Sequence, residues 1–143
     1  MERWELLIKW GAAAVGGFTS FLYGGWSSLL TALAVIVAVD YITGLAAAYK
    51  EGKDNPNDET KGLNSEVGFW GLAKKCLMFL IVGMAHHIDI ILDVNVLMVG
   101  SIYFFIANEI ISISENLGRA GISFPDQLKD VITVLKGKGA GKQ

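Results

Sequence analysis

The sequence has few cysteines, few prolines and fewer charged residues than ordinary soluble domains. It holds one cysteine, Cys76, and two prolines in 143 residues. A lone cysteine excludes an intrachain disulfide, and within an apolar run it is usually a small packing residue. Charged residues make up 18% of the chain, whereas about 25% is usual in soluble domains. The net charge of −2 is too small to indicate a nucleic-acid partner, and we expect none.

Motifs for catalysis and cofactor binding are also lacking. No glycine-rich phosphate loop precedes a lysine, and neither an HExxH sequence nor a nucleophile elbow occurs. His86 and His87 are adjacent, so one helix cannot easily present both to a single metal ion, and a closed metal site needs about four ligands. We therefore predict no enzyme activity, no cofactor and no metal site. The N-terminus also lacks the pattern of a cleavable signal peptide, so we expect it to stay attached.

What the sequence does contain is a series of long apolar segments, with a mean hydropathy of +0.45. Residues 26–49 carry one charged side chain, Asp40. A helix of this length, at about 1.5 Å per residue, spans the roughly 30 Å hydrocarbon core of a bilayer. Residues 76–94 and 96–114 form two further candidate spans joined by a tight turn, which favours an antiparallel hairpin. Residues 7–23 are weaker, and either cross the membrane or lie on its surface.

The remaining segments are polar. We expect residues 50–75 to form a solvated loop, in which Lys74 and Lys75 extend to the lipid headgroups. Pro125 begins a short amphipathic helix with Leu128, Ile132 and Leu135 on one face, and the tail 136–143 is expected to be disordered. The predicted fold is therefore a single domain, 1–143. It is an all-α integral membrane protein with three to four transmembrane helices and a short C-terminal amphipathic helix.

The positive charges predict the topology. All 12 lysines and arginines lie before residue 10, in the 50–75 loop or after residue 118, and none lies in the turns near residues 24 and 94. Positively charged loops stay in the cytoplasm. We therefore place the loop and the C-terminus on the cytoplasmic side of a multi-pass protein. The N-terminus is on the same side if there are four spans.

Each of the three strong spans carries polar groups at membrane depth. Ionisable residues there usually face a bundle interior or a water-filled cavity. One hypothesis is that such faces from several copies meet and line an aqueous opening. The alternative is that they form interhelical hydrogen bonds, worth about 0.6–2 kcal/mol each, that never meet bulk water. For His86 and His87, a pH-responsive role and a simple position near a helix end both stay open.

Three ordered motifs resemble one known family. They are Asp40-Tyr41-Ile42-Thr43-Gly44 before an alanine-rich helix end; Leu63-Asn64-Ser65 with Gly68, Gly71 and Lys74-Lys75; and Asn108-Glu109 followed by Ser112-Ile113, Glu115-Asn116, Gly118, Gly121-Ile122 and Pro125. Together, over residues 39–135, they resemble the toxin secretion/phage lysis holins. The segment 53–62 differs, because it is longer and more acidic than that family's usual connection.

The resemblance implies a phage or prophage holin. Such a protein accumulates in the host cytoplasmic membrane, associates with copies of itself, and opens lesions at a set time. The lesions release an endolysin, which is a cell-wall hydrolase, or in some relatives a toxin. Two alternatives stay open: a small ion channel or transporter subunit, and a non-conducting scaffold that recruits a partner through residues 125–136.

The sequence pattern and the family resemblance together predict two sets of functional residues. The candidate helix-packing positions are Gly16 and Gly17, which form small-residue pairs with Ala12 and Ala13, and Gly44. The candidate pore-lining or helix-contact residues are polar: Asp40, Thr43, His87, Asp89, Asn108, Glu109, Ser112, Glu115 and Asn116.

Overall fold

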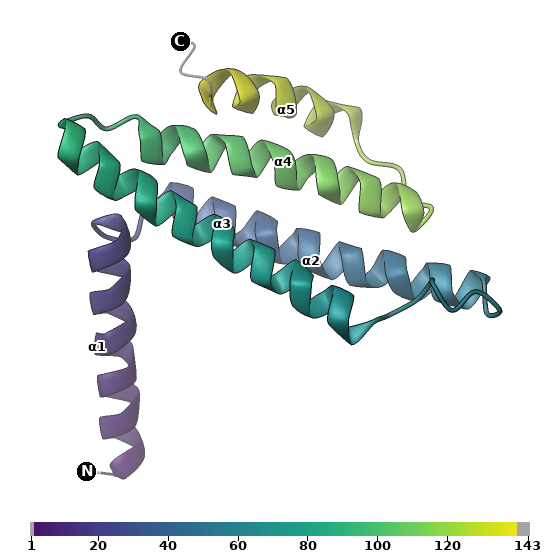
Figure 1. Cartoon of the computed structure of the whole chain (residues 1–143), viewed down its shortest axis with the longest axis horizontal. Helices are drawn as coiled ribbons and strands as arrows, with labels where there is room; N and C mark the ends of the chain where they lie inside the picture. The colour runs from purple at the N-terminus through teal and green to yellow at the C-terminus, as the bar shows by residue number, and fades with distance from the viewer. Residues whose placement is uncertain (1, 140–143) are drawn as a thin grey trace.

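The computed structural model describes residues 2–139, which contain five α-helices and no strand (Figure 1). The helices are α1 (Arg3–Tyr23), α2 (Ser28–Asp54), α3 (Ser65–Leu92), α4 (Leu97–Arg119) and α5 (Asp126–Gly139). By length and composition, α1 to α4 could each cross a membrane. The predicted all-α fold, with apolar spans followed by a short C-terminal helix, is confirmed.

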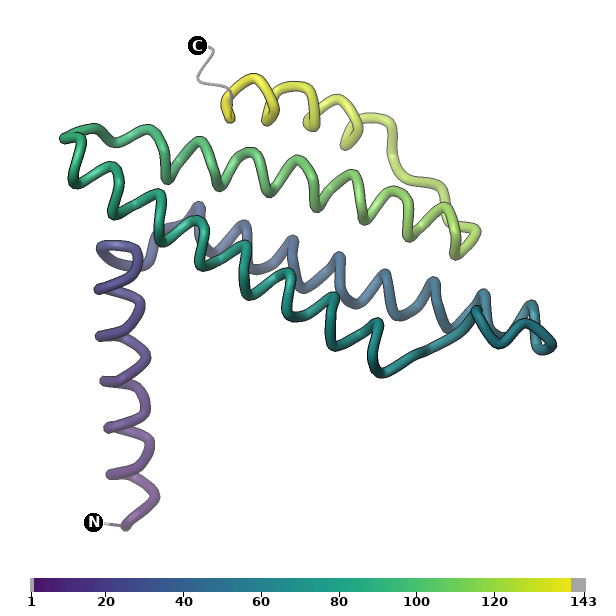
Figure 2. Tube along the Cα trace, in the orientation of Figure 1, coloured from purple at the N-terminus to yellow at the C-terminus, as the bar shows by residue number. Residues whose placement is uncertain are grey.

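Helices α2, α3 and α4 lie side by side, and α4 is placed between α5 and the α2–α3 pair (Figure 1). The interior of this bundle is apolar, and its fully buried larger side chains are Leu30, Leu33, Val82 and Ile102. Helix α1 points away from the bundle, across the direction of the other helices (Figure 2). It reaches α3 only through its C-terminal end, so most of α1 is exposed.

The junction between α1 and α2 depends on two glycines. Gly24 and Gly25 have φ values of 72° and 128°, a region that disfavours residues with a Cβ atom. The Gly24 amide closes α1 by donating to the Ser20 carbonyl at 2.9 Å. The Tyr23 hydroxyl donates to the Phe79 carbonyl of α3 at 3.1 Å. The predicted break at Gly24-Gly25 is thus a sharp turn that holds the end of α1 against α3.

The polar connection is shorter than the predicted loop of residues 50–75, because both flanking helices extend into it. An ion pair one helical turn apart, Lys50 to Asp54 at 2.5 Å, lies in the last turn of α2. Asn64 caps α3 by accepting from the Glu66 amide at 2.9 Å. The connection itself is residues 55–64. There, hydrogen bonds from Thr60 hold the pKa of the Asp58 carboxyl below its ordinary value.

The C-terminal region is more ordered than predicted. Helix α4 continues through Gly118 to Arg119, and Gly121, at φ 79°, makes the turn after it. Helix α5 extends to Gly139, so the expectation of disorder is wrong for residues 136–139. Residues 140–143 of the predicted tail lie outside the described residues. Helix α5 packs against α4, and Leu135 contacts the bundle core, whereas Leu128 is exposed.

Candidate functional site

An ion triad joins the three helices of the bundle. The Lys75 ammonium of α3 lies 2.5 Å from Asp40 Oδ2 of α2 and 2.6 Å from Glu109 Oε2 of α4. The side chains are only 11% exposed for Lys75 and 9% for each acid. One lysine therefore links two carboxylates from helices on either side, at a depth where a charge needs a partner.

Asn116 supplies further hydrogen bonds to Asp40. Its amide nitrogen donates to Asp40 Oδ1 at 3.0 Å and to the Asp40 carbonyl at 3.2 Å. It also lies 3.3 Å from Thr43 Oγ1, and that hydroxyl donates back to the Asp40 carbonyl at 3.0 Å. A Cβ atom at Gly44 would already lie 3.4 Å from Asn116 Nδ2, so only a small residue at 44 leaves Asn116 this position.

The triad carries a formal charge of −1, from two carboxylates and one ammonium. Removing one partner of a buried ion pair typically costs about 3–5 kcal/mol, whereas replacing the whole set by apolar groups is often neutral. The triad is therefore better suited to specifying how α2, α3 and α4 fit together than to adding net stability.

The polar contacts continue toward the 55–64 connection. Arg119 makes a bidentate ion pair with Glu51, with contacts of 2.8 and 2.7 Å, and a third contact to Asn116 Oδ1 at 3.3 Å. Beside them is a cavity of about 380 Å³ between α2, α3 and α4. Ser112, Lys74 and Asn64 line it together with the triad. This end of the bundle is therefore polar, whereas the core near Leu30 and Val82 is apolar.

Comparison with known proteins identifies the family. The model of the bacteriophage holin family matches residues 17–137. The chain belongs to the bacteriophage holin family. Holin-family membership makes it a multi-pass membrane protein of a non-enzymatic class. The match includes the triad and all three motifs of the predicted resemblance, which is thereby confirmed.

Individual relatives agree with the family assignment. The chain is 42% identical over 139 residues to an uncharacterized protein of Halalkalibacterium halodurans, covering 93% of this chain and 96% of that one. It is 33% identical over 140 residues to an uncharacterized 14.9 kDa protein of Clostridium perfringens, with 96% and 99% covered. A probable holin of Bacillus phage phi105 is 36% identical over 108 residues, with 75% and 73% covered. No solved structure matches the chain.

The motifs of this holin-family chain meet at the triad. Asp40, Thr43 and Gly44 come from the first motif, and Lys75 ends the second. Glu109, Ser112 and Asn116 come from the third and lie on one side of α4 at helical spacing. The other polar residues of that motif do not join them: Asn108 is half-buried outside the cluster, and Glu115 is exposed. The candidate polar residues of α4 thus lie on more than one side of the helix, and only those on one side face the bundle.

Asp89 has a different place, at the far end of the bundle. It is 5% exposed, and its two carboxylate oxygens accept from the Leu97 and Met98 amides, each at 2.9 Å. These are among the first amides of α4, which have no partner inside the helix. Asp89 therefore caps α4 across the α3–α4 turn, a contact that stabilises the hairpin.

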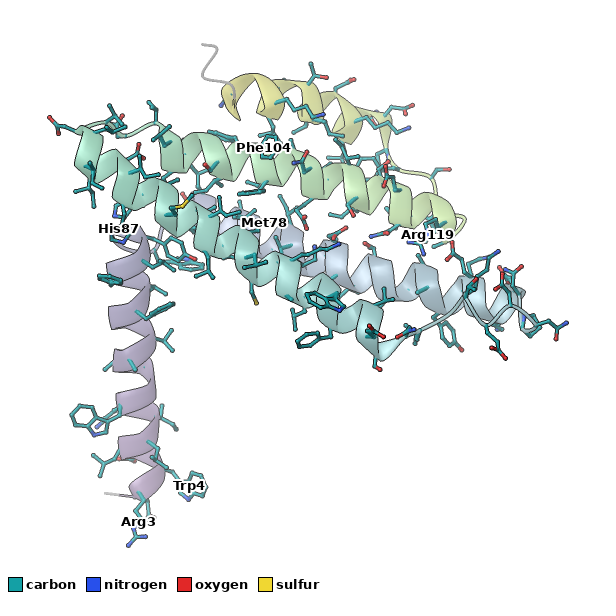
Figure 3. All side chains as sticks on the ribbon, viewed as in Figure 1. Arg3, Trp4, Met78, His87, Phe104 and Arg119 are labelled. Carbon is teal, nitrogen blue, oxygen red and sulfur yellow. The ribbon has the colours of Figure 1, made fainter. Side chains whose placement is uncertain are left out.

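The two histidines face the end of α1, and Figure 3 shows His87 beside it. The His87 ring lies 5.3 Å from the Phe21 ring, measured between centroids, and 5.4 Å from the ring of His86. A Cβ atom at Gly24 would lie 2.7 Å from His86 Cε1, so the turn packs closely on that ring. The His87 Nε2 atom is buried and has no hydrogen-bond partner. Within residues 2–139 no group of three His, Cys, Asp or Glu residues is arranged to hold a metal ion.

The predicted packing glycines of α1 do not pack against another helix among the described residues. A Cβ atom added at Gly16 or Gly17 would have no atom within 4 Å outside its own helix. Gly44, by contrast, lies against Asn116. The small residues of α1 are therefore available to lipid or to another molecule.

Lys75 is the site residue that the sequence analysis missed, because the lysine pair was assigned as a whole to the lipid headgroups. Lys74 is exposed, but Lys75 is not. Its spacing contains the signal: Lys75 is separated by alternating steps of three and four residues from Met78, Val82, Ala85 and Asp89. Val82, Ala85 and Asp89 are buried, so this periodic stripe predicts that Lys75 also faces the bundle.

Proposed function

We propose that this chain is a holin that oligomerises in the bacterial cytoplasmic membrane and opens lesions at a set time. The lesions release an endolysin, or a toxin, and the partners of the chain are copies of itself and the lipid bilayer. The C-terminus lies on the cytoplasmic side, since the positive residues gather near that end and in the 50–75 segment. Family membership supports the lytic role.

The observation that carries the proposal is the large exposed surface of the first helix. Only 6% of the apolar window of α1 is buried within the chain, and a Cβ atom added at Gly16 or Gly17 would have no other helix within 4 Å. The small-residue pairs formed by these glycines let helices of separate molecules approach closely in lipid. The polar groups of the triad, meanwhile, are satisfied within one chain. A single copy thus keeps its buried charges paired and leaves most of the surface of α1 exposed for assembly.

The two alternative functions have less support. A scaffold that recruits a partner through residues 125–136 would use α5, which already packs against α4 and directs Leu135 toward the bundle core. A selective channel or transporter subunit needs a conducting path. Such a path is not supported by the core of one chain, in which Leu30, Leu33 and Val82 are fully buried.

The test is induced expression in bacteria, alone and together with a cytoplasmic wall hydrolase that has no export signal. We expect abrupt lysis, after a fixed delay, only when both are present. Cells that make the hydrolase alone are the control. A steady, ion-selective conductance in living cells would contradict the holin proposal and favour a channel. Growth unaffected by co-expression would contradict lesion formation altogether.

A further inference from the structure

A polar cavity and an apolar groove adjoin each other between α2 and α3. The cavity is the one of about 380 Å³ described above, at the end of the bundle that leads to the 55–64 connection (Figure 1). The groove, also of about 380 Å³, is lined mostly by apolar side chains, among them Ala34 and Val37. Tyr41 and Lys75 line both. On α2 and on α3 alike, the groove lies farther from the connection than the cavity does, so it lies deeper in the membrane.

The depth of Lys74, which lines the cavity, matches the boundary between lipid headgroups and acyl chains. At about 1.5 Å per residue, Lys74 lies roughly 27 Å along α3 from Leu92, and the hydrocarbon core is about 30 Å thick. Trp70, one helical turn nearer the connection, is exposed, and tryptophan is enriched at this boundary. The cavity therefore lies at the level of the headgroups, and the groove lies at the level of the acyl chains.

The cavity presents hydrogen-bond donors that the chain itself does not use. Three cations, Lys74, Lys75 and Arg119, line it together with the two carboxylates of the triad. Lys75 and Arg119 are already paired with carboxylates. Within the described part of the chain, Lys74 makes no ion pair, and the hydroxyls of Tyr41 and Ser112 make no hydrogen bond. A phosphate beside Lys74 would thus meet an unpaired ammonium and two available hydroxyls.

Glycines keep this cavity open. Gly44, Gly68 and Gly71 are among its lining residues. A Cβ atom at Gly71 would have no neighbouring atom within 4 Å, and one at Gly68 would lie 3.6 Å from the Tyr41 hydroxyl oxygen. Larger side chains at these positions would occupy the space of the cavity without first meeting the backbone of another helix.

We infer that the cavity and the groove together bind one phospholipid of the cytoplasmic leaflet. Its phosphate lies at Lys74, within reach of the Tyr41 and Ser112 hydroxyls, and one acyl chain follows the groove past Ala34 and Val37. Basic pockets between membrane-spanning helices on the cytoplasmic side bind anionic headgroups. Phosphatidylglycerol therefore suits the excess of positive charge better than phosphatidylcholine. The inference takes the leaflet from the proposed topology and does not depend on lesion formation.

The test measures lipid binding to the purified full-length protein in detergent. Native mass spectrometry counts the phospholipids that stay bound when phosphatidylglycerol or phosphatidylcholine is added. We expect one phosphatidylglycerol per chain, retained about fivefold more often than phosphatidylcholine. Thermal unfolding is then followed with each lipid and with glycerol 3-phosphate, which has the phosphate but no acyl chain. Only phosphatidylglycerol should raise the midpoint clearly, because a ligand that binds the folded state stabilises it.

Two variants address the headgroup cavity. Lys74→Met removes the unpaired cation, and Gly71→Leu fills the cavity at a position that has room for a side chain. We expect each to lower the retention of phosphatidylglycerol about fivefold. The matched controls are Lys53→Met, at an exposed lysine that does not line the cavity, and Gly118→Leu, at an equally open glycine of α4. Both controls should retain the lipid as the parent does.

A third variant addresses the groove. Ala38→Phe places a ring where the acyl chain is expected, because Ala38 lines the groove. It should weaken retention, whereas Val39→Phe, at an exposed neighbour that lines neither the groove nor the cavity, should not.

Each contrary result overturns the inference. Equal retention of the two lipids would mean that no site here selects an anionic headgroup. A midpoint raised as much by glycerol 3-phosphate would mean that the cavity takes a soluble phosphate and not a lipid. Unchanged retention in Lys74→Met and Gly71→Leu, or equal losses in these variants and their controls, would place any bound lipid elsewhere on the surface.

Discussion

Lys75 of α3 and Asp40 of α2 form a buried ion pair with a contact of 2.5 Å, although 35 positions separate them in the sequence. The same ammonium contacts Glu109, so the pair belongs to a triad that includes the third helix of the bundle. In a membrane, where apolar side chains do not distinguish a neighbouring helix from lipid, such contacts specify which helices meet.

The first prediction concerns the lysine of the triad. Lys75→Met leaves two carboxylates facing each other without their cation, and breaking a buried pair typically costs about 3–5 kcal/mol. We expect a marked fall in thermal stability in detergent, together with loss of lysis. Lys74→Met, next to it but exposed, is the matched control and should change little.

The compensating variant makes this test sharper. In K75M/D40N/E109Q all three charges are removed, so no unpaired charge remains, and most of the lost stability should return. Stability that stays low in the triple variant would show that packing of the lysine stem, and not its charge, is what the bundle needs.

Asn116→Leu tests the side-chain amide that donates hydrogen bonds to Asp40. The substitution removes donors to a buried carboxylate oxygen and a carbonyl, and unsatisfied buried groups cost about 1–3 kcal/mol. We expect a lower midpoint of thermal unfolding than for Asn108→Leu, the same change at a half-buried position outside the cluster. Equal effects at the two positions would contradict the assigned role of Asn116.

Asp89→Ala removes the cap of α4. Loss of an N-terminal cap costs about 0.5–2 kcal/mol, and here two backbone amides lose their acceptor. Faster hydrogen exchange should therefore appear at the Leu97 and Met98 amides, while exchange at the Asp40 end of the bundle stays unchanged. Glu115→Ala, at an exposed site of α4, serves as the reference. Uniform acceleration along the chain would instead indicate global destabilisation.

Substitutions at the α1 glycines distinguish the folding of a single chain from the assembly of several copies. Because nothing lies within 4 Å of Cβ positions at Gly16 and Gly17, Leu at either site should leave the stability of the single chain unchanged. If these residues pack between copies, the same substitutions should reduce cross-linked oligomers and delay lysis. Gly11→Leu, equally open but on another side of α1, is the control. Normal oligomers in G16L and G17L would exclude this face from assembly.

The local features of the fold follow from the composition and from the positions of glycine and proline. Long apolar runs predict helices that can cross a membrane, Gly24-Gly25 predicts a break, and Pro125 predicts a new helix start. The ends of α2 and α3 were placed less well, because the 50–75 segment is polar and its helical turns depend on an ion pair and on the cap at Asn64. Hydropathy does not report either contact.

The candidate site was predicted only in part. Asp40, Glu109 and Asn116 stand out because each is polar within an apolar run, and such residues need a partner. Their partner Lys75 lies beside a second lysine at the start of a span, where a headgroup contact is the ordinary expectation. Similarly, Asp89 resembles another intramembrane acid until the α3–α4 turn brings the Leu97 and Met98 amides to it.

The amino-acid sequence alone determined that this chain is helical, belongs in lipid, and keeps a few charges where lipid cannot solvate them. Only the tertiary structure decided which charges neutralise one another, that α1 stands apart from the bundle, and that α5 covers one side of α4. The physical reason is that hydropathy depends on each residue and its near neighbours. The pairing of a buried ammonium with two carboxylates depends on which faces of three separate helices meet.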